Sequence, residues 1–300
     1  MSRKRAVLLG ILALTLVVLS WPHGSETDPV LSQVVPDHTE PCGGEKPPKP
    51  GGATFTCAFS DDFDGQEIDA TKWMPNKTTY AGVTSEAADC FVDDPDNISV
   101  SDGMLHLTSR VEPAPFVCAG PLGDFTTSTT AATVMTRNRF AQSYGRFEIR
   151  ARFPPTTAAG VHSALWLYPQ TTSYGPWPNS GEIDIAEWYS SVPEHVFPSV
   201  HYAGEVRPAS TGHTCVVASP ESSFHQYAVE WTPTLMRFIY DGEQCWEYTW
   251  TPTAPLIAPQ PFDQPFFVLL TQVYGGGSNA PTAASPPVAT MDVDWVRVWK

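Results

Sequence analysis

Three acidic residues stand close together in the stretch Ser180–Trp188, which reads Ser-Gly-Glu-Ile-Asp-Ile-Ala-Glu-Trp. In a regular β-strand, Glu182 and Asp184 would lie on one face and Glu187 on the other. A helix does not align them either, because five steps of about 100° leave Glu182 and Glu187 off a common face. One inserted residue, a β-bulge between Asp184 and Glu187, would bring all three onto the same face. The spacing therefore predicts a bulged strand.

Three carboxyl groups on one face could cleave a glycosidic bond. A retaining glycosidase holds two carboxyl groups about 5 Å apart. Glu182 would attack the anomeric carbon, while Glu187, kept protonated by like-charge repulsion, would protonate the leaving oxygen and then activate water. Asp184 could hydrogen-bond Glu182 and hold its charge in position. The alternative is a solvated acidic edge, but the apolar residues between the acids favour a strand that faces a core.

The strand must belong to a larger β-structure that can position it. From Ala53 to Lys300, short apolar or alternating runs recur between turn clusters, and no window of helical length shows a 3.6-residue stripe. The 30 prolines would interrupt most long helices. The segment Tyr240-Asp-Gly-Glu243 is typical of a hairpin turn. We predict one all-β domain over residues 54–300, built as a sandwich of two antiparallel sheets.

The N-terminal part of the chain predicts export. The basic start, Met1 to Arg5, is followed by an apolar run, Ala6 to Leu19, that is shorter than the roughly 20 residues of a spanning helix. Residues 1–22 are therefore interpreted as a secretory signal, or as an uncleaved anchor, because no clean small-x-small cleavage site follows. Residues 23–53 are rich in Pro, Gly and Ser and are predicted to form a linker. We expect a secreted protein, unless the uncleaved segment holds it at the membrane.

The cysteines support the same location. The chain has six cysteines and no C-x-x-C pair, which excludes the usual zinc and thioredoxin-like spacings. An even number in an exported chain predicts disulfides, although sequence alone does not select their connectivity. We expect sequential pairing: Cys42 with Cys57, Cys90 with Cys118, and Cys215 with Cys245.

The net charge and the absence of common catalytic motifs exclude several classes of partner and enzyme. The 32 acidic residues outnumber the 17 basic ones, and the formal charge of −15 argues against nucleic acid or an anionic membrane as partner. The chain contains no H-E-x-x-H, G-x-S-x-G, Walker or G-x-G-x-x-G motif. We expect a monomer that has no obligate protein partner and needs no cofactor for catalysis.

The acidic stretch resembles the bulged active-site motif, E-x-D-x-x-E, of glycoside hydrolase family 16. Six further segments match this family in order, so that the resemblance covers residues 54 to 300: Phe59–Gly65, Asp94–Val100, Tyr144–Ala151, Phe224–Trp231, Tyr240–Gly242 and Val293–Val298. The resemblance implies a jelly-roll β-sandwich whose two curved antiparallel sheets form a concave groove for a polysaccharide. It also implies Glu182 as nucleophile, Asp184 as its helper and Glu187 as acid/base.

The bulged spacing is similar to that of laminarinases, agarases and carrageenases, and differs from the unbulged motif of lichenases. The leading expectation is therefore retaining endo-cleavage of β-1,3-glucan. Two alternatives stay open: a hydrolase or transglycosylase that acts on another glycan such as a galactan, and a non-catalytic β-glucan-binding protein.

Other residues could line the groove. Trp166, Trp177 and Trp188 flank the acids in sequence, and sugar rings stack on such side chains. His201 matches a histidine that lines the family's groove, where its ring N–H could bond a sugar hydroxyl or the acid/base. The chain also departs from the family: His162 replaces an aromatic residue of the groove, and Gln272 stands where Asn is common.

The resemblance further implies a structural calcium ion far from the acids. Asp62, Gly103 and Asp294 occupy positions similar to its ligands, and Ca²⁺ prefers oxygen ligands.

Overall fold

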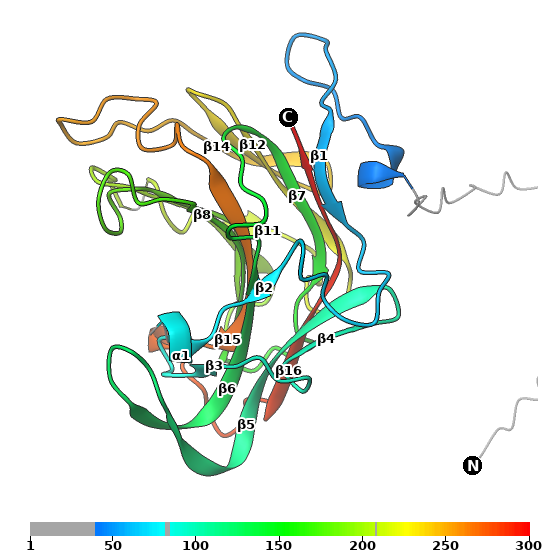
Figure 1. Ribbon diagram of the computed structural model, residues 1–300, viewed down its shortest axis with the longest axis vertical. Helices are drawn as coiled ribbons and strands as arrows, with labels where there is room; N and C mark the ends of the chain where they lie inside the picture. Colours follow the sequence, from blue (N-terminus) through cyan, green and yellow to red (C-terminus); the bar gives the residue numbers. More distant parts are fainter. Residues whose placement is uncertain (1–39, 82–84, 208) are drawn as a thin grey trace, which may run out of the picture. The chain divides into compact units, whose positions relative to one another are not determined.

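The computed structural model describes residues 40–81, 85–207 and 209–300 (Figure 1). The predicted signal or anchor, residues 1–22, and most of the predicted linker lie outside the described residues. No helix in the described ranges is long and apolar enough to cross a membrane.

Strands make up nearly all of the regular structure, as the sequence predicts. They are β1 (Cys57–Asp61), β2 (Met74–Pro75), β3 (Cys90–Phe91), β4 (Ile98–Ser101), β5 (Met104–Cys118), β6 (Phe125–Met135), β7 (Gly145–Arg152), β8 (Val161–Pro169), β9 (Glu182–Tyr189), β10 (His195–His201), β11 (Cys215–Val216), β12 (His225–Trp231), β13 (Met236–Tyr240), β14 (Glu243–Tyr248), β15 (Phe266–Tyr274) and β16 (Val288–Trp299). Three short helical turns accompany them: η1 (Pro41–Gly44), α1 (Thr78–Ala81) and η2 (Gly277–Asn279). The all-β prediction is confirmed.

The strands form one curved arrangement that folds back on itself. Their order is β11-β10-β9-β8-β15-β6-β5-β16-β7-β12-β13-β14, and each strand pairs with the next one in this order in antiparallel fashion. We call the half from β11 to β6 the inner sheet and the half from β5 to β14 the outer sheet. The two halves lie over each other as curved layers (Figure 1). This is the predicted jelly-roll sandwich.

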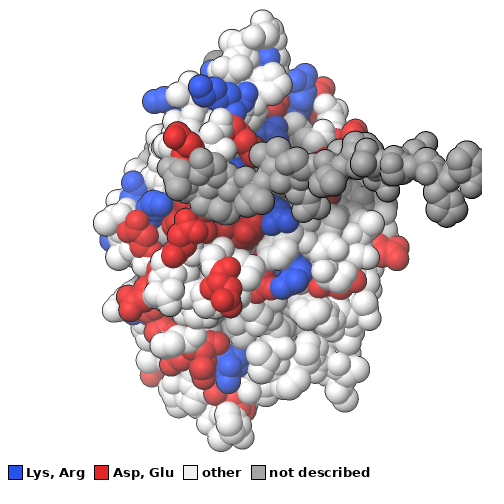
Figure 2. Space-filling model, turned by 90° about the vertical axis from the view of Figure 1, so that its right-hand side faces the viewer, with Lys and Arg blue, Asp and Glu red and all other residues white. Residues whose placement is uncertain are grey.

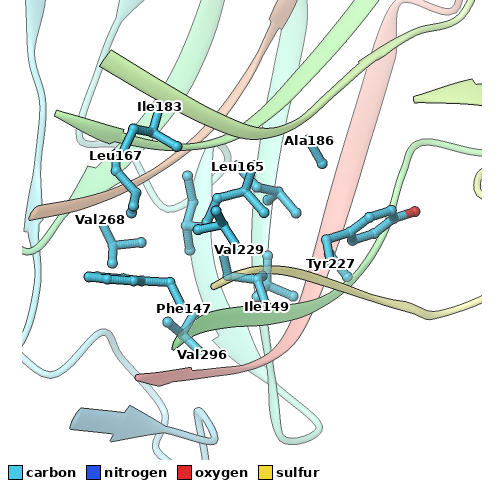
Figure 3. Close-up of a cluster of buried hydrophobic side chains, with 14 of the residues drawn as sticks. Phe147, Ile149, Leu165, Leu167, Ile183, Ala186, Tyr227, Val229, Val268 and Val296 are labelled. Carbon is cyan, nitrogen blue, oxygen red and sulfur yellow. The ribbon is translucent and has the colours of Figure 1, made fainter. Parts of the chain in front are cut away.

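The core lies between the two sheets. Side chains of β8, β9 and β15 point toward those of β7, β12 and β16 (Figure 3). On β9, the core-facing residues Ile183, Ile185 and Ala186 have no exposed surface. Burying each aliphatic side chain of this size contributes roughly 1.5–3 kcal/mol, with Ala186 contributing less. The opposite face of β9 can therefore carry polar groups, because the buried core-facing side chains already hold the strand in place.

The three predicted disulfides are present: Cys42–Cys57, Cys90–Cys118 and Cys215–Cys245. The sequential pairing is therefore confirmed.

The predicted linker, residues 23–53, is wrong at its C-terminal end. Residues 40–56, which we call the N-terminal strap, pack against the outer sheet. The fully buried guanidinium of Arg297 donates to Glu45 Oε1 (3.0 Å), and the indole of Trp299 donates to the carbonyl of Glu45 (3.1 Å). The Cys42–Cys57 disulfide closes the strap onto β1. The Pro and Gly content suggested an extended linker, but the disulfide and the buried arginine fix this segment to the domain.

Removing the Cys42–Cys57 bridge with a Cys42→Ala/Cys57→Ala double substitution is expected to lower the free energy of unfolding. The bridge closes a loop with a sequence separation of 15 residues. A loop of this length corresponds to about 3 kcal/mol of lost unfolded-state entropy. Denaturant unfolding monitored by tryptophan fluorescence would measure the change. The folded variant should keep its activity, because the strap packs on β1 and β16 rather than on β9. An unchanged free energy of unfolding would contradict the prediction.

The charge excess is visible on the surface. On the face that lies to the right in Figure 1, Asp and Glu side chains are spread widely, and Lys and Arg stand singly or in small groups (Figure 2). The described side chains on this face therefore present no broad basic area to a polyanion.

Candidate active site

The predicted β-bulge is present in β9. Against β8, Leu165 pairs with Ala186 and Trp166 pairs with Asp184, so Ile185 is the extra residue. Against β10 the register shifts at the same place. Glu182, Asp184 and Glu187 all line one hollow on the face of the inner sheet that is opposite the core. The bulge thus brings the three carboxyl groups onto one face.

A hydrogen bond from the outer sheet gives a partner to the backbone carbonyl that the bulge displaces. The Ile185 carbonyl, displaced from regular strand pairing, accepts a bond of 2.7 Å from the hydroxyl of Tyr240. Tyr240 lies at the end of β13 and is buried. A buried carbonyl without a partner would cost about 1–3 kcal/mol. The tyrosine therefore stabilises the irregular backbone that positions the acids.

Two adjoining hollows form the groove. The first, about 280 Å³, contains the three acids together with His162 and Trp166. The second, about 550 Å³, adds residues from β10 and the loop that follows it. Both hollows share Glu187 and Tyr189, so the candidate acid/base lies where they meet. A larger cavity than the first, about 350 Å³, lies near Tyr144 without an acidic pair, and we assign it no chemistry.

Glu187 has two hydrogen-bond donors and one imidazole neighbour. The hydroxyl of Tyr189 donates to its Oε1 (2.7 Å), and the hydroxyl of Ser199 donates to its Oε2 (3.2 Å). His162 Nε2 lies 3.5 Å from Oε1, and the His162 ring stacks on Tyr189 with centroids 4.3 Å apart. These contacts fix the carboxyl group in one orientation.

Asp184 and His201 form a second polar group beside Glu182. His201 Nε2 lies 3.4 Å from Asp184 Oδ2, and His201 Nδ1 lies 3.1 Å from Glu205 Oε2. The ring of Trp177 tilts against His201 at 5.7 Å between centroids. His201 thus contacts the helper Asp184 rather than Glu187.

The surroundings set the proton affinities of the three carboxyl groups in different directions. Burial raises the pKa of Glu182 well above its usual value, and the charge of Asp184 adds to this effect. Burial and the charge of Glu187 likewise raise the pKa of Asp184. Burial also acts to raise the pKa of Glu187, but the neighbouring His162 and the hydrogen bond from Tyr189 outweigh it and lower the pKa. The expectation that like-charge repulsion keeps Glu187 protonated is therefore wrong for the site without substrate, because His162 and Tyr189 stabilise the charged form of Glu187. Closely spaced carboxyl groups of this kind share protons among them, so the proton that Glu187 donates can come from the same set of acids.

Replacing His162 by Phe is expected to move the basic limb of the kcat/KM profile to higher pH. The phenyl ring keeps the stacking on Tyr189 and removes the nitrogen that faces Glu187. Because His162 lowers the pKa of Glu187, that pKa rises in the variant. A general acid works only while protonated, so activity persists to higher pH. The measurement is the pH dependence of polysaccharide hydrolysis.

A second histidine provides the control. His225 pairs with Asp241 outside the two hollows, and His225→Phe should leave the limb in place. If the basic limb of the kcat/KM profile of His162→Phe is unchanged or moves to lower pH, the prediction is wrong.

The predicted aromatic residues have different positions. Trp177, 49% exposed, lies beside His201 and close enough to Glu182 to lower the pKa of that carboxyl group, so it is placed to contact a sugar. Trp166 lines the first hollow, and its indole donates to Thr271. Trp188 is fully buried and stacks on Phe153 in the core. A stacking role for Trp188 is therefore wrong, because it follows Glu187 directly and alternation turns it to the opposite face.

Gln272 is also wrong as a direct groove contact. It is fully buried, accepts a hydrogen bond from Ser163 and donates one to Ser109 of the outer sheet. Its neighbours Thr271 and Val273 line the first hollow instead. Strand alternation therefore points the Gln272 amide between the two sheets.

Among the described residues that the sequence did not predict, three contact the side chains of Glu187 or His201: Tyr189, Ser199 and Glu205. Tyr189 and Ser199 each lie two positions from a predicted residue on the same strand, so strand alternation could have found them. Glu205 lies in the loop after β10 and contacts His201 only because that loop turns back. No local pattern indicates it.

The calcium prediction does not fit the side chains. Asp62 Oδ1 accepts a bond of 2.9 Å from the buried Arg297, and Asp294 forms an ion pair with Arg150. Gly103 lies in the turn between β4 and β5 with a φ of +70°. In the described residues, neither aspartate belongs to a cluster of three or more His, Cys, Asp or Glu side chains that could share a metal ion. The guanidinium groups already neutralise these carboxylates, so their side chains are a poor fit for the predicted Ca²⁺ site.

A calcium-selective chelator such as EGTA is accordingly expected to leave the melting temperature unchanged. The arginine partners supply the positive charge that a cation would otherwise provide. Thermal unfolding in EGTA and in added CaCl₂ would test this, since a ligand that binds only the folded state raises the melting temperature. A clear rise with CaCl₂ would overturn our interpretation of these residues.

Comparisons with known proteins point to one family. The family profile described as "Beta-porphyranase A-D, GH16 domain" matches residues 55–300. The beta-glucanase of Rhodothermus marinus is 31% identical over 255 residues, which cover 81% of this chain and 84% of that protein. The solved laminarinase from Rhodothermus marinus superimposes with a TM-score of 0.67 at 30% identity and covers 82% of this chain and 97% of its own.

Two other relatives are longer than this chain. The glucan endo-1,3-beta-glucosidase A1 of Niallia circulans is 29% identical over 272 residues, which are 85% of this chain and 39% of that protein. The keratan-sulfate endo-1,4-beta-galactosidase of Sphingobacterium multivorum is 31% identical over 252 residues, 82% of this chain and 55% of that protein. The chain thus spans about half or less of these two proteins.

Proposed function

We propose, since the chain belongs to glycoside hydrolase family 16, that it cleaves internal linkages of a polysaccharide with retention of anomeric configuration. The observation that carries the proposal is the bulged strand β9, which turns Glu182, Asp184 and Glu187 into one hollow of the groove. Two acids flanking a scissile bond are what double-displacement chemistry requires.

Each acid has a distinct role in this mechanism. Glu182 attacks the anomeric carbon while Glu187 gives its proton to the glycosidic oxygen, which breaks that bond and leaves a covalent glycosyl-enzyme. Glu187 then takes a proton from water, which attacks the same carbon and releases Glu182. Asp184 acts as a positioning residue that lies beside Glu182, where its charge helps to raise the pKa of Glu182. Two inversions at one carbon give net retention.

The leading substrate is β-1,3-glucan. The Rhodothermus and Niallia relatives, whose printed names state glucanase activities, support it. The second candidate is a β-linked galactan. It is favoured by the porphyranase profile and by the keratan-sulfate endo-β-galactosidase, which is as similar to this chain as the Rhodothermus enzyme. His162, standing where the groove of many laminarinases has an aromatic residue, also supports considering a sugar other than glucose.

A panel of polysaccharides would separate these candidates. Laminarin, porphyran and keratan sulfate are each incubated with the wild type and with Glu182→Gln, and the products are sized by chromatography. Oligosaccharides of several lengths appearing early from laminarin alone would support endo-cleavage of β-1,3-glucan. Release from porphyran or keratan sulfate alone would favour the galactan. Transglycosylation needs a separate incubation with an oligosaccharide of defined length. Products longer than that oligosaccharide would indicate it.

Two further outcomes would overturn parts of the proposal. Binding of laminarin without release from any glycan would leave a β-glucan-binding protein, although this chain retains all three acids. Proton NMR that showed inversion in the first-formed product would remove Glu182 as the nucleophile.

We infer that the domain acts outside the cell and as a monomer. Its three disulfides persist in oxidising compartments and are rare in the cytosol. Analytical ultracentrifugation of the protein would test the monomer.

A further inference from the structure

His201 lies between two carboxylates. Its Nδ1 faces Glu205 Oε2 at 3.1 Å and its Nε2 faces Asp184 Oδ2 at 3.4 Å. A neutral imidazole carries one N–H and one lone pair, so it can donate to only one of the two. The other nitrogen then points a lone pair at a carboxylate oxygen. Either a proton held between Nε2 and the Asp184 carboxyl group or a bound cation makes both contacts favourable.

Glu205 determines which nitrogen donates. Its carboxylate also accepts from the guanidinium of Arg207 (3.0 Å) and from the hydroxyl of Ser210 (3.4 Å), and it therefore remains an acceptor. Nδ1 of His201 is the nitrogen that donates to it. The Nε2 lone pair consequently points toward Asp184. Histidines that bind metals are held in this way, with the second nitrogen donating to a carboxylate.

Beyond Nε2, three potential ligand atoms converge closely enough to hold one metal ion. Asp184 is only 4% exposed, and its Oδ2 has no hydrogen-bond partner among the described residues. Ligand atoms of Glu182, Asp184 and His201 lie within 4.8 Å of one another. Zinc with ligand bonds near 2.0–2.1 Å separates neighbouring ligand atoms by about 3.3 Å. The 3.4 Å between His201 Nε2 and Asp184 Oδ2 is close to that separation and too long for a strong hydrogen bond.

We propose that Glu182, Asp184 and His201 bind a divalent transition cation such as Zn²⁺, and that the cation inhibits the enzyme reversibly. Three protein ligands leave the fourth position open to water. The nitrogen ligand and the small ligand number select Zn²⁺ or Cu²⁺ over Mg²⁺ and Ca²⁺, which prefer more oxygen ligands. A proton between the Asp184 carboxyl group and His201 Nε2 is the competing occupant, and it leaves when the metal binds. The inhibition rests on the proposed function, because the metal would occupy the nucleophile; the binding does not.

Metal binding can be measured without any substrate. Isothermal titration calorimetry with ZnCl₂ and visible absorption with Co²⁺ would be applied to the full chain and to His201→Gln and Glu205→Gln. We expect one equivalent of binding to be lost or strongly weakened in His201→Gln. Removing the outer carboxylate in Glu205→Gln should weaken the same equivalent about 10–100-fold. The absorption spectrum of the bound Co²⁺ should show a four-coordinate ion in the wild type.

A matched control lies elsewhere in the fold. His225 also bonds a carboxylate through Nδ1, Asp241 Oδ2 at 2.6 Å, and its Nε2 is buried without a partner, but no second carboxylate pairs with it among the described ion pairs. His225→Gln should bind Zn²⁺ as the wild type does. Equal affinity in the wild type and His201→Gln, or equal loss in His225→Gln, would overturn the proposal. Melting curves of each variant would establish that it is folded.

The inhibition is tested separately. Zn²⁺ should raise the apparent KM of the wild type for its polysaccharide, and EDTA should restore it. Zn²⁺ binding without hydrolysis of any glycan would leave the metal site intact and remove the proposed activity. Hydrolysis that is insensitive to Zn²⁺ in a protein that binds it would place the metal away from Glu182 and overturn the inhibitory site.

Discussion

Replacing Glu182 by Gln is expected to lower kcat for polysaccharide hydrolysis by on the order of 10⁴-fold or more. The neutral amide cannot form the covalent intermediate, so the first step of the double displacement fails. The substitution removes one negative charge from a buried set of carboxyls whose burial and mutual repulsion raise the pKa of Glu182. The fold should therefore be retained or slightly stabilised. Reducing-end release and thermal unfolding, measured on the same preparation, would separate loss of chemistry from loss of structure.

A matched acid-to-amide change controls for charge alone. Glu243 is exposed on β14, outside the two hollows, and Glu243→Gln should hydrolyse at the wild-type rate. If Glu182→Gln also kept the wild-type rate, Glu182 could not be the nucleophile, and the roles of the three acids would have to be reassigned.

Replacing Glu187 by Ala is expected to give a loss that depends on the leaving group. General acid catalysis contributes about 10²–10⁴-fold, and a sugar leaving group needs it because a sugar alkoxide is a poor leaving group. A dinitrophenyl glycoside needs no proton, so its glycosyl-enzyme should still form. Deglycosylation would then be slow, because no base activates water. Burst kinetics with the aryl substrate and rescue by added azide would reveal this pattern.

The same variant should lose the basic limb of its pH profile for the aryl substrate, because the group that titrates there is absent. Tyr189→Phe is the comparison: it removes one donor to Glu187 but leaves the carboxyl, so activity on polysaccharide should fall less than in Glu187→Ala. An equal loss on the polysaccharide and on the aryl glycoside would contradict the acid/base role of Glu187.

Local features of the sequence predicted much of the site. The spacing of Glu182, Asp184 and Glu187 indicated the bulge, because a period of two residues is a property of any strand and an odd interval needs an inserted residue. The same rule, applied one residue further, would have placed Trp188 in the core, where the structure has it. The composition likewise predicted an all-β chain, which the strands confirm.

Other features depend on contacts between distant segments. The hydroxyl of Tyr240 reaches the Ile185 carbonyl across 55 positions, and Arg297 reaches Glu45 across 252. The latter contact makes the strap part of the domain, against its Pro-rich composition. Such pairings arise only when sheets close over each other, and no local pattern specifies them.

The sequence by itself thus determined the three acids, their bulged strand and the family, while the disulfide pairing was an expectation that the structure confirmed. The tertiary structure alone decided which neighbours tune those acids. His162 faces Glu187 and Glu205 faces His201 because β8, β9, β10 and the following loop converge on one groove. Proton affinity depends on burial and on charges within a few ångströms, and these are distances in space that the order of residues does not contain.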